Sequence, residues 1–173
     1  MRKILTALIV VLVLILTIFI QINLLNVVPL FGVTANLGIV VIVGFGLMNG
    51  KLIGGLTGAF YGLLLDIIFS KIIGINLILY MLVGIFTGHI SSRFSKDNKT
   101  AMVMNVLVAT VIFEIASYLA ISLLQGSEIH FWYMIYIIAL ETAYNILLTA
   151  ILHKFMTGIG DIVNKSKNSY YLL

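Results

Sequence analysis

Residues 4–22 read ILTALIVVLVLILTIFIQI, an apolar run of nineteen residues whose only polar members are two threonines and one glutamine. As an α-helix this run is about 28 Å long, close to the roughly 30 Å thickness of a bilayer's hydrocarbon core. Arg2 and Lys3 precede it, as basic residues precede a signal peptide. The run is longer than the apolar region of a signal peptide, however, and Asn23 and Asn26 follow it instead of a small-residue cleavage site. The stretch therefore predicts an uncleaved first transmembrane span.

The composition of the whole chain also indicates a membrane protein. Of its 173 residues, 62% are hydrophobic and 9% are charged, and the mean hydropathy is +1.21. A soluble domain carries about a quarter of its residues as charged side chains, so the composition excludes that class. A single proline and the lack of low-complexity segments exclude an intrinsically disordered chain. The absence of cysteine excludes disulfides, cysteine-ligated metals and thiol catalysis.

Further apolar runs, separated by short polar segments, divide the rest of the chain. Together with the first run they predict an all-α integral membrane protein, a single six-helix transmembrane bundle with a polar and basic cytoplasmic tail over residues 153–173. The second run is short, so we expect it either to begin near residue 30 or to be tilted or partly re-entrant. The expected spans are residues 4–22, 30–48, 52–69, 75–90, 101–124 and 131–152.

The basic residues are divided unequally between the two sides of this bundle. Six spans place both termini on one side; nine of the ten basic residues then lie on that side, and Lys71 alone lies on the other. Because loops rich in Lys and Arg stay in the cytoplasm, we expect both termini to be cytoplasmic, in a multi-pass protein of the cell membrane. Orientation thus explains the net charge of +4, and we expect contact with membrane lipid and not with nucleic acid. The nine residues are Arg2, Lys3, Lys51, Arg93, Lys96, Lys99, Lys154, Lys165 and Lys167.

Glycines recur at intervals of four residues in the third and fourth spans. Gly54, Gly58 and Gly62 share one face of the third helix, and Gly84 and Gly88 share one face of the fourth. Such a stripe lets a second helix approach closely, so that van der Waals and Cα–H···O contacts hold the pair in lipid. We expect the stripes to pack helices within this chain, because a bundle must first pack its own helices. A face for dimerisation is the alternative.

Asp66 continues the four-residue step beyond Gly62, near the outer end of the third span. A carboxylate is costly in hydrocarbon, so it is expected to face the bundle, water or a partner. One interpretation is a helix-end carboxylate that pairs with Lys71 or hydrogen bonds to the following turn. The other is a polar anchor for a partner at the outer mouth of the bundle.

Two further acids lie near the middle of the last two spans. A short loop joins these helices as an antiparallel pair, so Glu114 and Glu141 are expected at similar depth, with Tyr118 and Asn145 among their polar neighbours. Neither span contains Lys or Arg, so at least one carboxyl group is expected to be protonated, to share a proton or to face water. A hydrogen-bonded clasp between the helices is the structural interpretation. Proton relay or cation binding is the functional one.

Nothing in the sequence indicates an enzyme, a metal site or a cofactor. The three histidines, His89, His130 and His153, stand at the ends of expected spans and lack the spacing of metal ligands on a helix. The chain contains no G-x-S-x-G, H-E-x-x-H or phosphate-binding loop.

Five short motifs stand out between residues 36 and 88. They are Asn36-Leu37, Gly50 with Gly54, Gly62-Leu63-Leu64-Leu65-Asp66, Gly74-Ile75-Asn76-Leu77 and Tyr80-Met81-Leu82-Val83-Gly84. Together they resemble the MreD family of bacterial rod shape-determining proteins. The chain length, the six expected spans and the cytoplasmic termini are similar to that family over the whole chain.

The resemblance implies a non-enzymatic membrane scaffold or regulator of the cell-elongation machinery that maintains rod shape. It implies action on peptidoglycan synthesis together with an MreC-like bitopic protein. The further partners implied, directly or through MreC, are a RodA-type polymerase and its class B penicillin-binding protein, with MreB filaments reached indirectly. It also implies an architecture resembling the substrate-binding subunits of energy-coupling-factor transporters.

A vitamin-binding subunit of such a transporter is the alternative function. Those subunits commonly dock to their energising partner through small residues spaced by four on the first helix. Here Ala7 is the only Ala or Gly of the first span, with Lys3 and Val11 at the flanking positions, which favours the rod-shape function. A proton-coupled enzyme or channel built on Glu114 and Glu141 is a third hypothesis.

Overall fold

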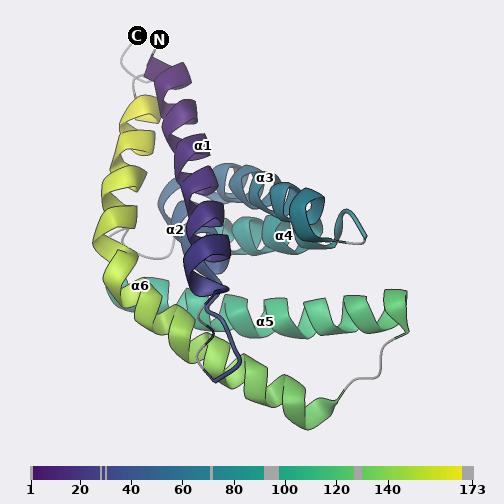
Figure 1. Ribbon diagram of the computed structural model, residues 1–173. Helices are drawn as coiled ribbons and strands as arrows, with labels where there is room; N and C mark the ends of the chain where they lie inside the picture. Colours follow the sequence, from purple (N-terminus) through teal and green to yellow (C-terminus); the bar gives the residue numbers. More distant parts are fainter. Residues whose placement is uncertain are drawn as a thin grey trace.

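The computed structural model describes residues 2–27, 29, 31–70, 72–91, 98–126 and 130–168. Every regular element in these ranges is a helix, which confirms the all-α fold class. Figure 1 shows α1 and the final part of α6 running together toward the end of the molecule where both chain ends lie. The elements are α1 (Arg2–Ile20), the π-helix η1 (Gln21–Leu25), α2 (Leu37–Asn49), α3 (Lys51–Phe69), α4 (Ile75–Ile90), α5 (Lys99–Gln125) and α6 (Phe131–Asn168).

The short helix α2 forms the centre of the core. All thirteen of its residues are buried, and its sequence is apolar on every side, as expected of a helix that is surrounded by protein. The other five α-helices all contact it. The helix begins at Leu37, not near residue 30, because Asn36 caps its N-terminus.

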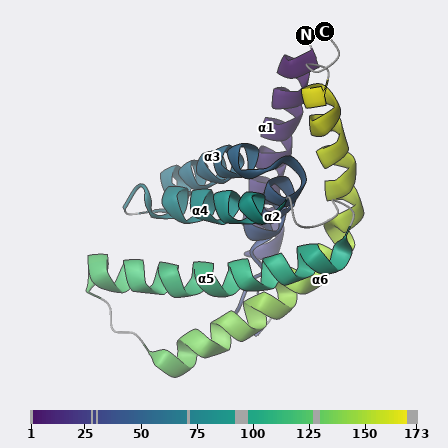
Figure 2. The ribbon, with the colours of Figure 1, turned by 180° about the vertical axis from the view of Figure 1, so that it is seen from behind.

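A tight turn joins α2 to α3. Gly50 alone separates the two helices, and its backbone has φ of 86°, a conformation that residues with a side chain rarely adopt. Its N–H donates to the carbonyl of Gly46 in α2, and its carbonyl accepts from the N–H of Gly54 in α3. The chain then folds back again, so that α3 and α4 lie side by side as an antiparallel pair (Figure 2).

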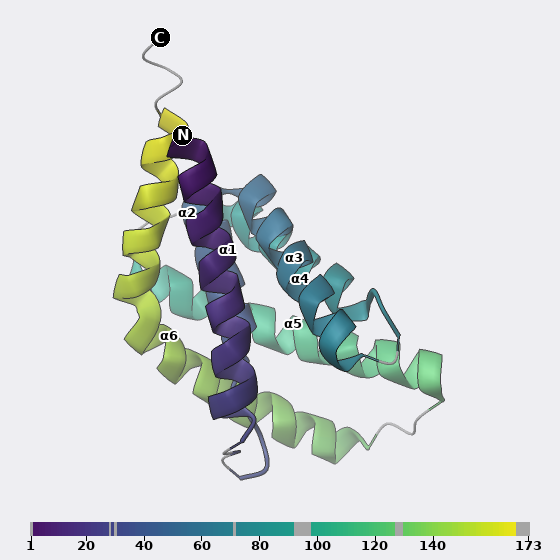
Figure 3. The same ribbon diagram turned by 45° about the horizontal axis from the view of Figure 1, so that its top comes forward.

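The last two helices cover the opposite side of α2. They are antiparallel, and they diverge toward the connection between them in all three views (Figure 3). The final helix continues beyond residue 152, where the tail was expected to begin, and bends partway along (Figure 1). Met156, Ile159 and Val163 are buried. Their spacing of three and four residues places them on one helix face, and this apolar face explains why the helix continues.

Four helices are long and apolar enough to cross a membrane, by length and composition, within the described residues. At thirteen and sixteen residues, α2 and α4 are about 20 and 24 Å long, so a full crossing by these two remains a prediction. Large apolar side chains lie on the outside of the long helices, including Leu8, Ile112 and Trp132. Such a surface suits lipid and not water. The four ranges are Ile4–Leu25, Lys51–Phe69, Lys99–Leu124 and Phe131–Val163.

Candidate functional site

Asp66 lies near the C-terminal end of α3 and is fully buried. Its Oδ2 accepts hydrogen bonds from the backbone N–H groups of Gly74 (2.8 Å) and Leu77 (3.0 Å). Its Oδ1 accepts from the hydroxyl of Ser70 (2.8 Å) and from the backbone and side-chain amides of Asn76 (3.3 and 3.0 Å). Asp66 therefore satisfies the free N–H groups at the start of α4, a role that the preceding glycine cannot fill.

Lys71, the other partner considered for Asp66, lies outside the described residues. The carboxylate is nevertheless well placed without it, because several donors surround it and the positive end of the α4 dipole faces it.

The five glycines of the two stripes all lie between α3 and α4. A Cβ atom built on Gly54 would overlap the carbonyl oxygen of Gly84, and one built on Gly84 would overlap the carbonyl of Gly54. The other three meet backbone as well: Gly58 that of Tyr80, Gly62 that of Asn76 and Gly88 that of Lys51. Backbone cannot move aside as a flexible side chain can, so the close approach of these helices requires glycine.

Asn36 connects the start of α2 to three other helices. Its Oδ1 accepts from the N–H of Ile39 (3.2 Å) and from the hydroxyl of Tyr80 in α4 (2.8 Å). Its own N–H donates to Oδ1 of Asn145 in α6 (2.7 Å). The side-chain amide of Asn145 donates in turn to the hydroxyl of Thr110 in α5 (2.9 Å). One continuous set of hydrogen bonds thus links α2, α4, α5 and α6.

Gln21 adds a second cap to the same end of α2. Its Oε1 accepts from the N–H of Leu37 (2.9 Å), and its Nε2 donates to the carbonyl of Ala35 (2.9 Å). Gln21 begins the π-helix that ends the first span, so this contact ties α1 to the core helix.

The two acids of α5 and α6 meet beside this network. The carboxyl groups of Glu114 and Glu141 lie within interaction range of each other. Two ionised carboxylates this close in an apolar interior would repel each other, which favours a proton on one of them. The side chains of Asn36 and Asn145 also lie beside Glu141. Glu141 is 7% exposed, and its Oε1 makes no hydrogen bond to any described residue. Tyr118, one turn beyond Glu114, is half-buried and interacts electrostatically with both carboxyl groups.

We call this set of side chains the polar cluster. Its members are Asn36, Tyr80, Thr110, Glu114, Glu141 and Asn145. Two aromatic contacts border it, since the ring of Tyr80 packs against those of Tyr61 (centroids 5.1 Å apart) and Phe113 (4.5 Å). In the part of the chain that is described, no group of three or more His, Cys, Asp or Glu residues is placed to hold a metal ion.

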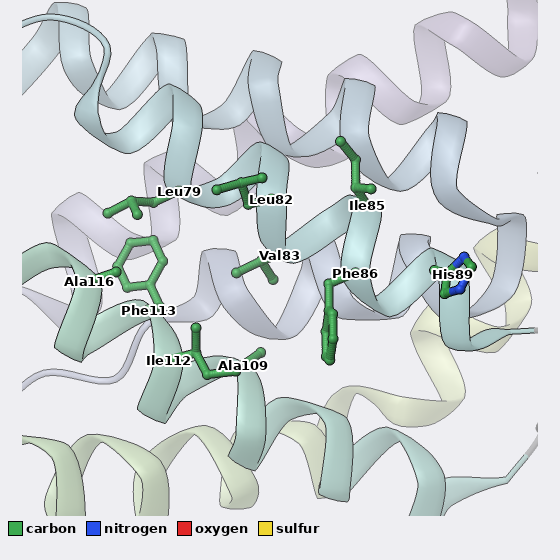
Figure 4. A pocket seen from close by; sticks show the side chains of 10 residues that line it. All are labelled: Leu79, Leu82, Val83, Ile85, Phe86, His89, Ala109, Ile112, Phe113 and Ala116. Atoms are coloured by element: carbon green, nitrogen blue, oxygen red, sulfur yellow. The ribbon is translucent and has the colours of Figure 1, made fainter.

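An apolar groove lies between α4 and α5. Its volume is about 440 Å³, and Figure 4 shows apolar side chains from both helices along it, with His89 at one end. Ala109 and Ala116 contribute small side chains two turns apart on α5. We call this surface the α4–α5 groove. Its lining residues are Leu79, Leu82, Val83, Ile85, Phe86, His89, Ala109, Ile112, Phe113 and Ala116.

Three residues of these sites were not expected from their chemistry. In the sequence, Asn36 and Tyr80 stand out only as members of motifs, and Gln21 only as a polar residue in the first apolar run. Asn36 had a usable signal, because Asn directly before an apolar helix is a preferred N-cap. The contacts of Gln21 and Tyr80 are between distant parts of the chain, and local pattern does not predict them.

Comparison with known families gives one result. The model of the family described as rod shape-determining protein MreD matches residues 1–159. No curated protein and no solved structure matches the chain.

Proposed function

The chain belongs to the MreD family of rod shape-determining proteins, and we propose that it is a non-enzymatic membrane scaffold that acts with an MreC-like bitopic protein on peptidoglycan synthesis. A role in rod-shape determination, in a multi-pass membrane protein, follows from the family and from the four long apolar helices. The family is one of shape-determining proteins and not of enzymes. The match over residues 1–159 is the observation that carries the proposal.

The proposed place of action is the cell membrane, with both termini in the cytoplasm. The unequal distribution of basic residues supports this orientation. The adjacency of the start of α1 and the end of α6 agrees with termini on one side (Figure 3).

We propose that the α4–α5 groove receives the single transmembrane helix of the bitopic partner. The glycine stripes, which are the usual surface for close helix association, are already used between α3 and α4. The groove is the apolar surface that combines two helices with small residues, Ala109 and Ala116, on its floor. A helix lying there would contact both walls at once. The polymerase, the penicillin-binding protein and MreB filaments would then be reached through that partner.

Cysteine crosslinking tests the groove directly, because the chain has no cysteine of its own. The variants Leu82→Cys and Ile112→Cys place a thiol on each wall, and both parent residues are 52% exposed. Leu8→Cys, at a site 59% exposed on α1, is the matched control. We expect disulfides from positions 82 and 112 to cysteines in the partner's transmembrane helix, and none from position 8. Crosslinking from position 8 alone would contradict the groove.

Co-purification tests the function itself. In mild detergent the protein should bring down wall-synthesis proteins, and its depletion should turn rods into rounded cells. Recovery of transporter ATPases in their place would support the vitamin-transporter alternative.

A further inference from the structure

The proposed scaffold function does not explain why the polar cluster contains two acids, Glu114 and Glu141. A packed core needs no carboxyl groups, and two of them face each other here in an apolar interior. The titratable groups that interact with the pair are the phenols of Tyr80 from α4 and Tyr118 from α5. The core helix α2 contains no titratable residue, and α3 contributes Tyr61 behind Tyr80. The described surroundings therefore supply no positive charge to balance the pair.

A bound cation, either a metal ion or a proton, must then balance the charge of the pair. The neighbouring amides show which of the two fits. A metal ion such as Na⁺ or Ca²⁺ needs several oxygen ligands. The Asn36 Oδ1 already accepts two hydrogen bonds, from Ile39 N–H and the Tyr80 hydroxyl, and so has no lone pair left. The Asn145 Oδ1 accepts from the N–H of Asn36.

These contacts also fix which way each amide points. Because backbone N–H groups can only donate, the atoms that face them must be the amide oxygens. The amide NH₂ groups of Asn36 and Asn145, and not their oxygens, are therefore left to act on Glu141, and that of Asn145 also donates to the hydroxyl of Thr110. Donors repel a metal ion, whereas they are compatible with a carboxyl pair that holds a proton.

We infer that Glu114 and Glu141 form a proton-binding site, in which the pair shares a proton and Oε1 of Glu141 is left without a hydrogen-bond donor in the described part of the chain. This oxygen is buried and makes no hydrogen bond to the described residues, so it is the free acceptor of the site. Release of the proton leaves two like charges between α5 and α6, next to the two Asn residues that hold the start of α2. The charge of the pair therefore acts on the junction of α2, α5 and α6.

Asp66 is a natural comparison for the pair, because it is also a buried carboxyl group but has donors on both oxygens. Dicyclohexylcarbodiimide distinguishes a protonated carboxyl group from an ionised one. A nitrogen of the reagent takes the proton of the acid, and the central carbon of the reagent bonds to the carboxyl oxygen. We expect it to label Glu114 or Glu141 at neutral pH in the full-length protein in lipid nanodiscs. Peptide mass spectrometry should find no label on Asp66.

Infrared spectroscopy gives a second readout that needs no reagent. At neutral pH we expect the carbonyl band of a protonated carboxylic acid, lost reversibly on alkaline titration. The double variant Glu114→Gln/Glu141→Gln should lack the band, and Asp161→Asn, which removes an exposed acid of α6, should keep it. If the double variant does not fold, the label on the wild-type protein still assigns the proton.

Two results would overturn the inference. One is the absence of both the acid band and the label at neutral pH, which would mean that both carboxyl groups are ionised. The other is loss of labelling when Na⁺ or K⁺ is added at constant pH and ionic strength, which would mean that the site holds a metal ion. Unchanged labelling in these salts supports the proton site.

Discussion

Asp66 shows how a membrane protein accommodates a fully buried carboxylate. The side chain accepts hydrogen bonds on both oxygens, two of them from free N–H groups in the first turn of α4, those of Asn76 and Leu77. A helix in lipid cannot leave these N–H groups to water, so each must find an acceptor within the protein. The sequence motif that ends in Asp66 and the one that begins at Gly74 are therefore two halves of one cap.

Asp66→Asn tests this cap. Asparagine has one acceptor oxygen, and its NH₂ group would face backbone donors, so we expect the variant to lose about 1 to 3 kcal/mol of stability. The readout is the thermal midpoint of the detergent-solubilised protein, followed by fluorescence size exclusion. Asp161→Asn, at an exposed site on α6, should match the wild type. Equal midpoints for both variants would contradict the capping role.

At the level of single residues, the sequence is informative where the chemistry is local. The acids at 66, 114 and 141 stand out in a chain that is 9% charged, because burial of a carboxyl group in an apolar span needs an explanation. The partners of those acids depend on the tertiary fold. Tyr80 reaches Asn36 across 44 residues, and Asn36 reaches Asn145 across 109. No spacing rule connects positions so far apart.

At the scale of elements, α3 and α4 form the tightest unit of the fold. The glycines on each helix face backbone of the other, so the two axes can approach more closely than any side chain would allow. Thr57 of α3 and Thr87 of α4 are buried, and their hydroxyls donate to carbonyls of their own helices, at 2.8 Å in each case. Their polar groups are thereby satisfied without a cross-helix partner.

Gly58→Leu should disrupt this unit. A side chain there collides with the backbone of Tyr80, and overpacking of this kind costs about 1 to 3 kcal/mol. We expect less folded protein in the membrane and a lower thermal midpoint. Gly158 on α6 has open space around its would-be Cβ atom, so Gly158→Leu is a matched control and should be tolerated. Comparable losses in both variants would indicate a general intolerance of bulk instead of a tight α3–α4 contact.

The boundaries of elements were less predictable than their type. Each described α-helix overlaps one of the apolar runs. Helix α2 starts later than its run suggested, because a cap and not hydropathy sets its N-terminus. The final helix extends to Asn168 through a segment that reads as polar and basic. Its buried stripe of Met156, Ile159 and Val163 is masked in the composition by the charged residues on the other faces.

At the scale of the whole molecule, the unequal lengths of the six α-helices decide how the protein can lie in a bilayer. Helix α2 is enclosed by the others, so its thirteen residues need not match the hydrocarbon thickness as a lipid-exposed span must. Helix α4 packs against α2 and α3 and is the shorter wall of the α4–α5 groove. Either both short helices cross fully, or they enter and leave on one side.

Single-cysteine accessibility in intact cells distinguishes these arrangements. If all six helices cross, Lys96→Cys and a cysteine at the C-terminus lie in the cytoplasm, and Glu128→Cys lies outside. A membrane-impermeant maleimide should then label Glu128→Cys in intact cells, and Lys51→Cys and Lys96→Cys only after permeabilisation. The natural absence of cysteine makes each signal specific. Labelling of Lys51→Cys but not of Lys96→Cys in intact cells would show that α2 and α4 enter and leave on one side. Labelling of Lys96→Cys would show that the count of crossings before α5 is odd, and would overturn both arrangements.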